Sequence, residues 1–133
     1  MQRKPIPKKT RLIVYQKYDG HCAYCGCKLE YKDMQVDHVE PVYTNDYKRL
    51  RGETHLSDEE INNVANLMPA CRQCNFYKGT WKLEDFRKNL TSMMLNRLHD
   101  TFNYKLGVKY GIIKEDLTPV VFYFEKVKGE KEQ

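Results

Sequence analysis

The sequence predicts a single α+β domain, and three observations lead to that fold class. The chain has 133 residues, enough for one modest hydrophobic core but not for two. Short β-branched stretches at 35–39 and 120–124 lie among segments with helical periodicity. Two C-x-x-C pairs, separated by residues 26–70, would tie distant parts of the chain together. We therefore expect one domain over 1–133 with a metal staple.

The composition is that of a globular protein, with 41% apolar and 31% charged residues. The formal net charge of +5 is compatible with a polyanionic partner without requiring one. No apolar run is long enough for a signal sequence or a membrane span. The sequence therefore predicts a cytoplasmic protein without a membrane partner.

The cysteine pairs are Cys22–Cys25 and Cys71–Cys74, and four thiolates at this spacing suit a tetrahedral, structural Zn²⁺. The chain holds five cysteines, so disulfides would leave one thiol over, and a reducing cytosol favours metal. Four buried cysteines without metal are the alternative. The fifth thiol, Cys27, is either a free buried cysteine or a substitute for Cys25 as a ligand.

The N-terminal third predicts a basic arm and one short helix. Residues 1–9 carry Lys and Arg before any acid, and Thr10 is a plausible N-cap for a helix over 11–18. Gly20 can adopt the left-handed conformation that ends a helix. Gly26 gives the backbone room to turn around a metal.

The middle of the chain predicts a strand, an irregular segment and a capped helix. The strand at 35–39 is followed by a polar stretch at 43–54, expected to be an exposed loop. Ser57 and Glu60 form a capping-box pattern that opens a short helix toward Ala65.

After the second cysteine pair the pattern is helical. A helix carrying Asn75 and Lys78 should stop at Gly79, before a long amphipathic helix over 81–106. The remaining segment, 107–133, supplies the C-terminal strand and a charged tail. The apolar stripe of the long helix, expected to be core, consists of Leu83, Phe86, Leu90, Met94, Leu98, Phe102 and Leu106.

A second set of residues suits a hard cation rather than zinc. Asp37 and Asn75 offer oxygen ligands, and His38 is an imidazole that can take a proton. Neighbours on a regular strand point to opposite faces. Either the strand is distorted there, or His38 acts while Asp37 reaches round.

The segments Val36-Asp37-His38-Val39-Glu40-Pro41 and 66–78 resemble the HNH endonuclease family, in order, over residues 19–87. The resemblance implies a ββα-metal nuclease core stapled by a four-cysteine zinc site, with flanking helices. It implies that His38 is the general base and Asp37 a ligand of the catalytic Mg²⁺, or of another divalent ion such as Mn²⁺ or Ni²⁺.

Further residues take their roles from the same resemblance. Asn66 would hold the loop and orient the histidine, and Asn75 would supply the second protein ligand, making an H-N-N variant. Lys78 would meet a phosphate. The implied substrate is DNA, contacted mainly through its phosphate backbone, and the basic residues Lys48, Arg49 and Arg51 are candidate contacts.

Two other functions compete with a nuclease. One is a non-catalytic zinc-knuckle module that binds nucleic acid or protein, in which Asp37, His38 and Asn75 are incidental. The other is a nuclease-derived scaffold without activity. The oligomeric state stays open, as does an origin in a phage, a mobile element or host defence.

Overall fold

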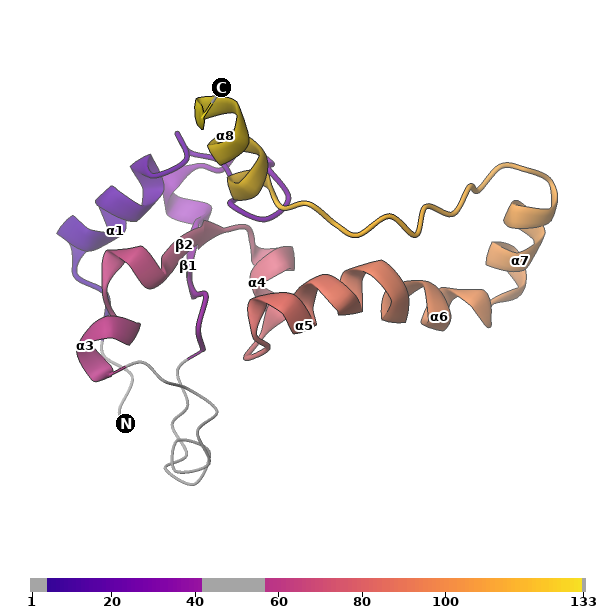
Figure 1. Cartoon of the computed structure of the whole chain (residues 1–133), viewed down its shortest axis with the longest axis horizontal. Helices are drawn as coiled ribbons and strands as arrows, with labels where there is room; N and C mark the ends of the chain where they lie inside the picture. Colours follow the sequence, from indigo (N-terminus) through magenta and orange to yellow (C-terminus); the bar gives the residue numbers. More distant parts are fainter. Residues whose placement is uncertain (1–4, 42–56, 133) are drawn as a thin grey trace. The chain divides into compact units, whose positions relative to one another are not determined.

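The computed structural model describes residues 5–41 and 57–132, and within them the chain divides into two compact units (Figure 1). The first unit contains the residues up to Leu83 together with those from Val121 onward, and the second contains Glu84–Val120. The single-domain organisation therefore stays a prediction. The units are described separately below.

Two antiparallel strands lie at the centre of the first unit, β1 (Gln35–His38) and β2 (Leu67–Ala70). Their register places His38 opposite Leu67 and Asp37 opposite Met68. All four residues of β2 are buried. Helix α4 (Arg72–Lys78) follows β2 directly, with the Cys71 side chain accepting a hydrogen bond from the backbone N–H of Cys74 at its start. The α+β fold class with a strand–strand–helix core is confirmed.

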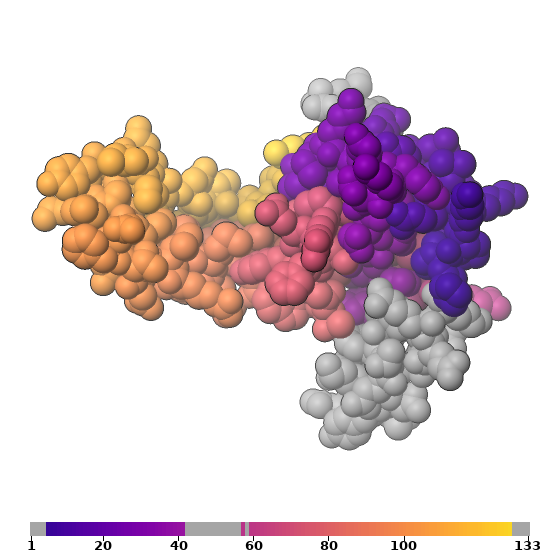
Figure 2. Space-filling model, turned by 180° about the vertical axis from the view of Figure 1, so that it is seen from behind, coloured from indigo at the N-terminus to yellow at the C-terminus, as the bar shows by residue number. Residues whose placement is uncertain are grey.

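Helix α1 (Lys8–Gln16) holds two loops in place through long basic side chains. Arg11 donates hydrogen bonds from Nη2 to the carbonyl oxygens of Tyr31 (3.0 Å) and Met34 (2.6 Å). Lys17, just after the helix, donates from Nζ to the carbonyl of Val64 (2.9 Å) and to that of Leu67 (2.8 Å), the first residue of β2. The helix begins three residues earlier than Thr10 predicts, because Pro7 provides the extended residue before it. In the space-filling view, the indigo N-terminal residues and the purple residues up to 41 lie side by side (Figure 2).

Between α1 and β1 the chain makes the first cysteine knuckle. Gly26 has a φ of +82°, as the turn requires, and its N–H donates to the Cys22 carbonyl at 2.9 Å. The N–H of Ala23 donates to the carbonyl of Pro69 at 2.8 Å. The carbonyl of Pro69 therefore joins the knuckle to β2.

The C-terminal helix α8 (Tyr123–Glu132) packs on this knuckle. Its first N–H groups have no partner within the helix, and those of Tyr123 and Phe124 donate to the carbonyls of Tyr24 (3.0 Å) and Ala23 (2.8 Å). Phe122 is 1% exposed, and its ring meets that of Tyr24 edge-on at 5.4 Å. The knuckle and the C-terminal segment therefore share one core.

The predicted C-terminal strand at 120–124 is wrong. Residues 119–122 pair with no strand in the described part of the chain, and the helix begins at Tyr123. The backbone N–H of Phe122 is accepted by Glu125 Oε1 at 2.9 Å, half of a capping box. This cap and the knuckle carbonyls offset the strand preference of Val120 and its neighbours.

The first unit also contains short elements that lead into the strands. The capping box of Ser57 and Glu60 is present and opens α3 (Asp58–Ile61). This helix is shorter than the sequence predicts, and a 3₁₀ turn, η2 (Val64–Asn66), continues the path to β2. Another 3₁₀ turn, η1 (Tyr31–Asp33), precedes β1. No described helix is both long and apolar enough to cross a membrane.

The second unit replaces the predicted continuous helix over 81–106 with shorter pieces. In order, these are α5 (Leu83–Lys88, whose first residue belongs to the first unit), a π turn η3 (Asn89–Met93), α6 (Met94–His99) and α7 (Phe102–Lys109). Thr101 interrupts the helix, because its side chain accepts the N–H of Tyr104 and starts α7. The predicted stripe is consequently broken. Phe86 is buried, but Met94, Leu98, Phe102 and Leu106 are exposed.

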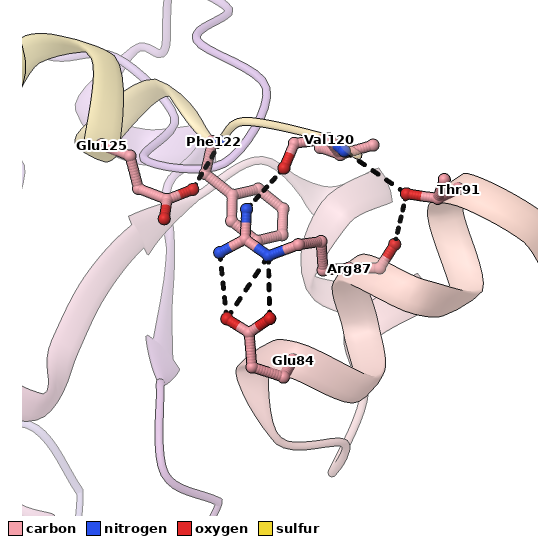
Figure 3. Close-up of polar contacts among 6 residues, drawn as sticks. All are labelled: Glu84, Arg87, Thr91, Val120, Phe122 and Glu125. Carbon is pink, nitrogen blue, oxygen red and sulfur yellow. Dashed lines mark hydrogen bonds and ion pairs between the residues drawn. The ribbon is translucent and has the colours of Figure 1, made fainter. Parts of the chain in front are cut away.

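Arg87 and Thr91 fasten the end of the second unit to its beginning (Figure 3). The Arg87 guanidinium pairs with the carboxylate of Glu84 at 3.0 Å and donates from Nη1 to the Val120 carbonyl at 2.5 Å. Thr91 Oγ1 accepts the Val120 N–H at 3.3 Å and donates to the Arg87 carbonyl at 2.9 Å. The Thr91 side chain, within the π turn, therefore competes for the carbonyl of Arg87 in α5.

The buried ring of Phe122 yields a first prediction. Phe122→Ala should lower the free energy of unfolding by ~3–5 kcal/mol, because it removes a buried aromatic ring and leaves a cavity. Urea denaturation followed by circular dichroism measures the change. The matched control is Phe76→Ala, whose side chain is 86% exposed. Equal stability of the two variants would contradict the packing of Phe122 against the knuckle.

Candidate active site

The centre of the candidate site is the buried carboxylate of Asp37 on β1. Its Oδ2 lies 3.1 Å from the ammonium of Lys78, on α4, and accepts a hydrogen bond from the Tyr24 hydroxyl at 2.5 Å. The Lys78 ammonium also donates to the His38 carbonyl at 2.9 Å. The side chains of Asp37 and Lys78 are 5% and 0% exposed. One buried network thus connects β1, α4 and the first cysteine knuckle.

The network sets the charge state of Asp37 through opposing effects. Burial raises the pKa of the Asp37 carboxyl, because desolvation disfavours its anion. The neighbouring Lys78 ammonium and the Tyr24 hydroxyl act in the other direction. The pKa of Tyr24 is raised, first by burial and then by the negative charge of Asp37, so the hydroxyl stays a donor.

His38 follows Asp37 on β1 and contacts a different partner. Its Nε2 lies 3.2 Å from Oδ1 of Asn62, in the turn after α3. The side chain of Asp37 contacts Tyr24 and Lys78 instead. The two neighbours therefore have separate partners, as alternation along a strand requires, and β1 is regular in its pairing with β2.

Asn66, immediately before β2, fixes the backbone that follows His38. Its Nδ2 donates to the carbonyls of Ile61 (2.9 Å) and Glu40 (3.1 Å), and its Oδ1 accepts the N–H of Glu40 at 2.8 Å. The Val39 N–H is bound by the Asn66 carbonyl at 2.9 Å. These contacts hold the loop that follows β1, and the role of Asn66 in orienting the histidine stays a prediction. The imidazole itself is contacted by Asn62.

Asn75 and Lys78 both lie on α4, but their environments differ. Asn75 is half-buried, on the turn of the helix before Lys78. The predicted phosphate contact of Lys78 does not fit its position, because its ammonium is buried against Asp37 and the His38 carbonyl. The cause is the helix register, which places Lys78 under β1 and not at the surface.

The thiols of the two predicted knuckles come together. The Sγ atoms of Cys22, Cys25, Cys27 and Cys71 all lie within 4.8 Å of one another, and Cys25 and Cys71 are 3.9 Å apart. Cys74 is hydrogen-bonded to Cys22 through the two side chains. All five cysteines of the chain therefore meet at one place, including Cys27.

This cluster fits a tetrahedral metal ion such as zinc. Zn–S bonds of about 2.3 Å place neighbouring sulfurs about 3.8 Å apart, close to the Cys25–Cys71 separation. The Cys74 thiol lowers the pKa of Cys22 to about 4 by donating to its thiolate. The same interaction raises the pKa of Cys74. Repulsion between thiolates thus limits ionisation, and a bound cation would relieve it.

Tyr24, Asn62 and the membership of Cys27 in the cluster were not predicted from the sequence. Tyr24 stands inside the first C-x-x-C pair, where an aromatic hydroxyl beside a metal knuckle was a usable signal. No local pattern marks Asn62, because its relation to His38 depends on the path of the chain between the strands. The predicted phosphate contacts Lys48, Arg49 and Arg51 lie outside the described residues, as does the loop at 43–54.

No family model matches the sequence. A curated relative from Bacillus subtilis (strain 168), named "SPbeta prophage-derived putative HNH endonuclease YoqL", is 26% identical over 90 residues, which cover 65% of this chain and 36% of that protein. The Septu protein PtuB of Bacillus thuringiensis is 35% identical over 72 residues, covering 53% of this chain and 23% of PtuB. The chain thus spans about a third and about a quarter of these two relatives.

Among solved structures, the chain is similar to the Type II-C Cas9 enzyme of Actinomyces naeslundii, with a TM-score of 0.48 and 22% identity. The match covers 67% of this chain and 8% of the Cas9 chain. The sequence match to the prophage-derived relative confirms the resemblance to HNH endonucleases that the motif residues predict.

The buried ion pair yields a second prediction. Lys78→Met should lower the free energy of unfolding by ~3–5 kcal/mol, because it leaves the Asp37 carboxylate buried without its counter-ion. Lys82→Met is the matched control, since Lys82 lies 3.9 Å from Glu40 with 42% of its side chain exposed. That pair should contribute at most about 1 kcal/mol. Thermal denaturation measures both variants. If they lost equal stability, the buried pair would contribute no more than the exposed one.

Proposed function

We propose that this chain is a metal-dependent HNH endonuclease that hydrolyses DNA phosphodiester bonds. The observation that carries the proposal is that His38, Asn66 and Lys78 come together at one end of the β1–β2 pair. His38 lies opposite the residue that follows Asn66, and α4 reaches both Asp37 and His38 through Lys78. The named relative supports the same activity.

His38 is the proposed general base. The contact between Nε2 and Asn62 Oδ1 orients the ring, and an amide oxygen can only accept, so the proton is placed on Nε2. This assigns the proton-accepting role to Nδ1. A neutral imidazole can remove a proton from the attacking water near neutral pH. Asn66 supports the ring indirectly, by holding the backbone at Val39 and Glu40.

Asp37 and Asn75 are the proposed protein ligands of a divalent ion, Mg²⁺ or a similar one such as Mn²⁺ or Ni²⁺. Both described contacts of the Asp37 carboxylate fall on Oδ2, so we assign the ion to Oδ1. When bound, such an ion neutralises charge that grows on the phosphate and the leaving oxygen. Lys78 and Tyr24 hold the carboxylate in a fixed orientation for it.

The proposal includes one structural Zn²⁺ at the cysteine cluster, which supports the site through Tyr24. It assigns phosphate contacts to Lys48, Arg49 and Arg51 on the sequence alone, with DNA bound mainly by its backbone. A non-catalytic zinc-knuckle binding module is the second candidate. The buried Asp37–His38 pair with its dedicated partners favours the nuclease, because a binding module needs no such arrangement.

The role of His38 is tested by plasmid cleavage in Mg²⁺, Mn²⁺ and EDTA. His38→Ala should lose ~10²–10⁴-fold in cleavage rate while the fold and DNA affinity are retained, because only proton transfer is removed. His99→Ala, in the second unit, is the matched control and should stay close to the parent rate. Parent-like cleavage by His38→Ala would exclude this residue as the base and favour the binding module.

The role of Asn75 is tested by calorimetric Mn²⁺ binding. Asn75→Ala should weaken Mn²⁺ binding and DNA cleavage together, because it removes one of the two proposed protein ligands of the ion. The buried Lys78–Asp37 ion pair is not altered. Asn96→Ala, an exposed asparagine on α6, is the control and should leave both unchanged. Unaltered Mn²⁺ affinity in Asn75→Ala would place the ion elsewhere.

A further inference from the structure

We propose that the zinc site uses five thiols instead of four. Cys22, Cys25 and Cys71 are constant ligands, and Cys27 and Cys74 exchange as the fourth. The inference rests on the zinc binding proposed above. It goes beyond the paired C-x-x-C pattern, which assigns no function to Cys27.

The first tetrad is defined by proximity of its sulfur atoms. Cys22, Cys25, Cys27 and Cys71 lie with every Sγ within 4.8 Å of every other. The backbone keeps Cys27 there, because its carbonyl accepts the N–H of Cys22 at 2.8 Å and closes the knuckle. The backbone conformation of the knuckle therefore holds Cys27 within the cluster.

The second tetrad replaces Cys27 by Cys74. The Cys74 side chain is hydrogen-bonded to those of Cys22 and Cys71, two of the constant ligands. Its backbone N–H also donates to Cys71 Sγ at 3.4 Å, at the first turn of α4. Helix α4 thus holds Cys74 at the cluster, whereas the turn of the first knuckle holds Cys27. Both candidates for the fourth position are fixed independently.

Coordination chemistry makes the two candidates alternatives. Structural zinc takes four ligands in a tetrahedron, and Zn²⁺ has no electronic preference that would select one thiolate over another. Five thiolates around one such ion leave one displaced. Cys22 is fully buried, and Cys25 and Cys71 belong to both tetrads, whereas Cys27 and Cys74 each belong to one. Cys27 and Cys74 are therefore the thiols that can exchange, because loss of either leaves a complete tetrad.

Zinc content and affinity of purified variants test the exchange. The parent should contain one zinc per chain by elemental analysis. Cys27→Ser and Cys74→Ser should each keep that zinc, with affinity against a chromophoric chelator lowered less than about tenfold. The double variant should lose roughly 10²–10³-fold, the share of one thiolate in the binding of structural zinc. Cys71→Ser should lose as much alone.

A loss of 10²-fold or more in Cys74→Ser alone would overturn the inference, because Cys27 would not have replaced it. The same loss in Cys27→Ser alone would also overturn the inference, because Cys74 would not have replaced Cys27. A parent without zinc would refute zinc binding itself, a result distinct from either and independent of DNA cleavage.

A second measurement needs no substitution, so it decides the matter even if a variant fails to fold. Brief treatment of the zinc-loaded parent with N-ethylmaleimide, followed by peptide mass spectrometry, identifies the displaced thiol. We expect singly modified chains divided between Cys27 and Cys74, with Cys22, Cys25 and Cys71 protected. Modification confined to Cys27, or confined to Cys74, would show one fixed tetrad and overturn the exchange.

Discussion

The structure of the first unit depends on one buried ammonium group. Lys78 brings a positive charge under β1, where desolvation would be prohibitive without the Asp37 carboxylate and the His38 carbonyl. This requirement fixes the register of α4 against the strand. Lys78 contacts both the Asp37 side chain and the His38 carbonyl, and these two adjacent residues of β1 are both buried although their side chains have different partners. An apolar pair could supply similar stability, but it would not specify the orientation of a carboxylate.

The second constraint is the path from the metal knuckle to the carboxylate. Tyr24 lies between two cysteines, donates its hydroxyl to Asp37 and packs its ring on Phe122. The same knuckle is bound to β2 through Pro69 and to α8 through two backbone hydrogen bonds. A metal ion bound at the cysteine cluster would therefore do more than close a long loop, because Tyr24, which the knuckle positions, is part of the candidate active site.

Local sequence signals predicted those parts of the structure that depend on local physics. The Ser57–Glu60 capping box, the turn at Gly26 and the end of α4 at Gly79 all follow from residues within one turn of each other. The cysteine pairs and the motif around His38 marked segments that meet at the cysteine cluster and at the Asp37 network. The errors have long-range causes. Residues 120–122 lead into a helix that begins at Tyr123, because Glu125 and distant knuckle carbonyls accept the N–H groups at its start. The burial of Lys78 and the contact of Asn62 with His38 depend on tertiary packing that no local pattern encodes.

The dependence of the knuckle on α8 has a consequence for synthesis on the ribosome. Tyr24 is translated almost a hundred residues before Phe122 and Tyr123, which cover its ring and its carbonyl. Until then the nascent chain holds its cysteines and its acidic residue without the cover that fixes them. Domains acquire their final packing as units once the contacting segments are available. A nascent chain that ends before Phe122 therefore lacks the cover of the knuckle, so the candidate site assembles only after that segment has left the ribosome.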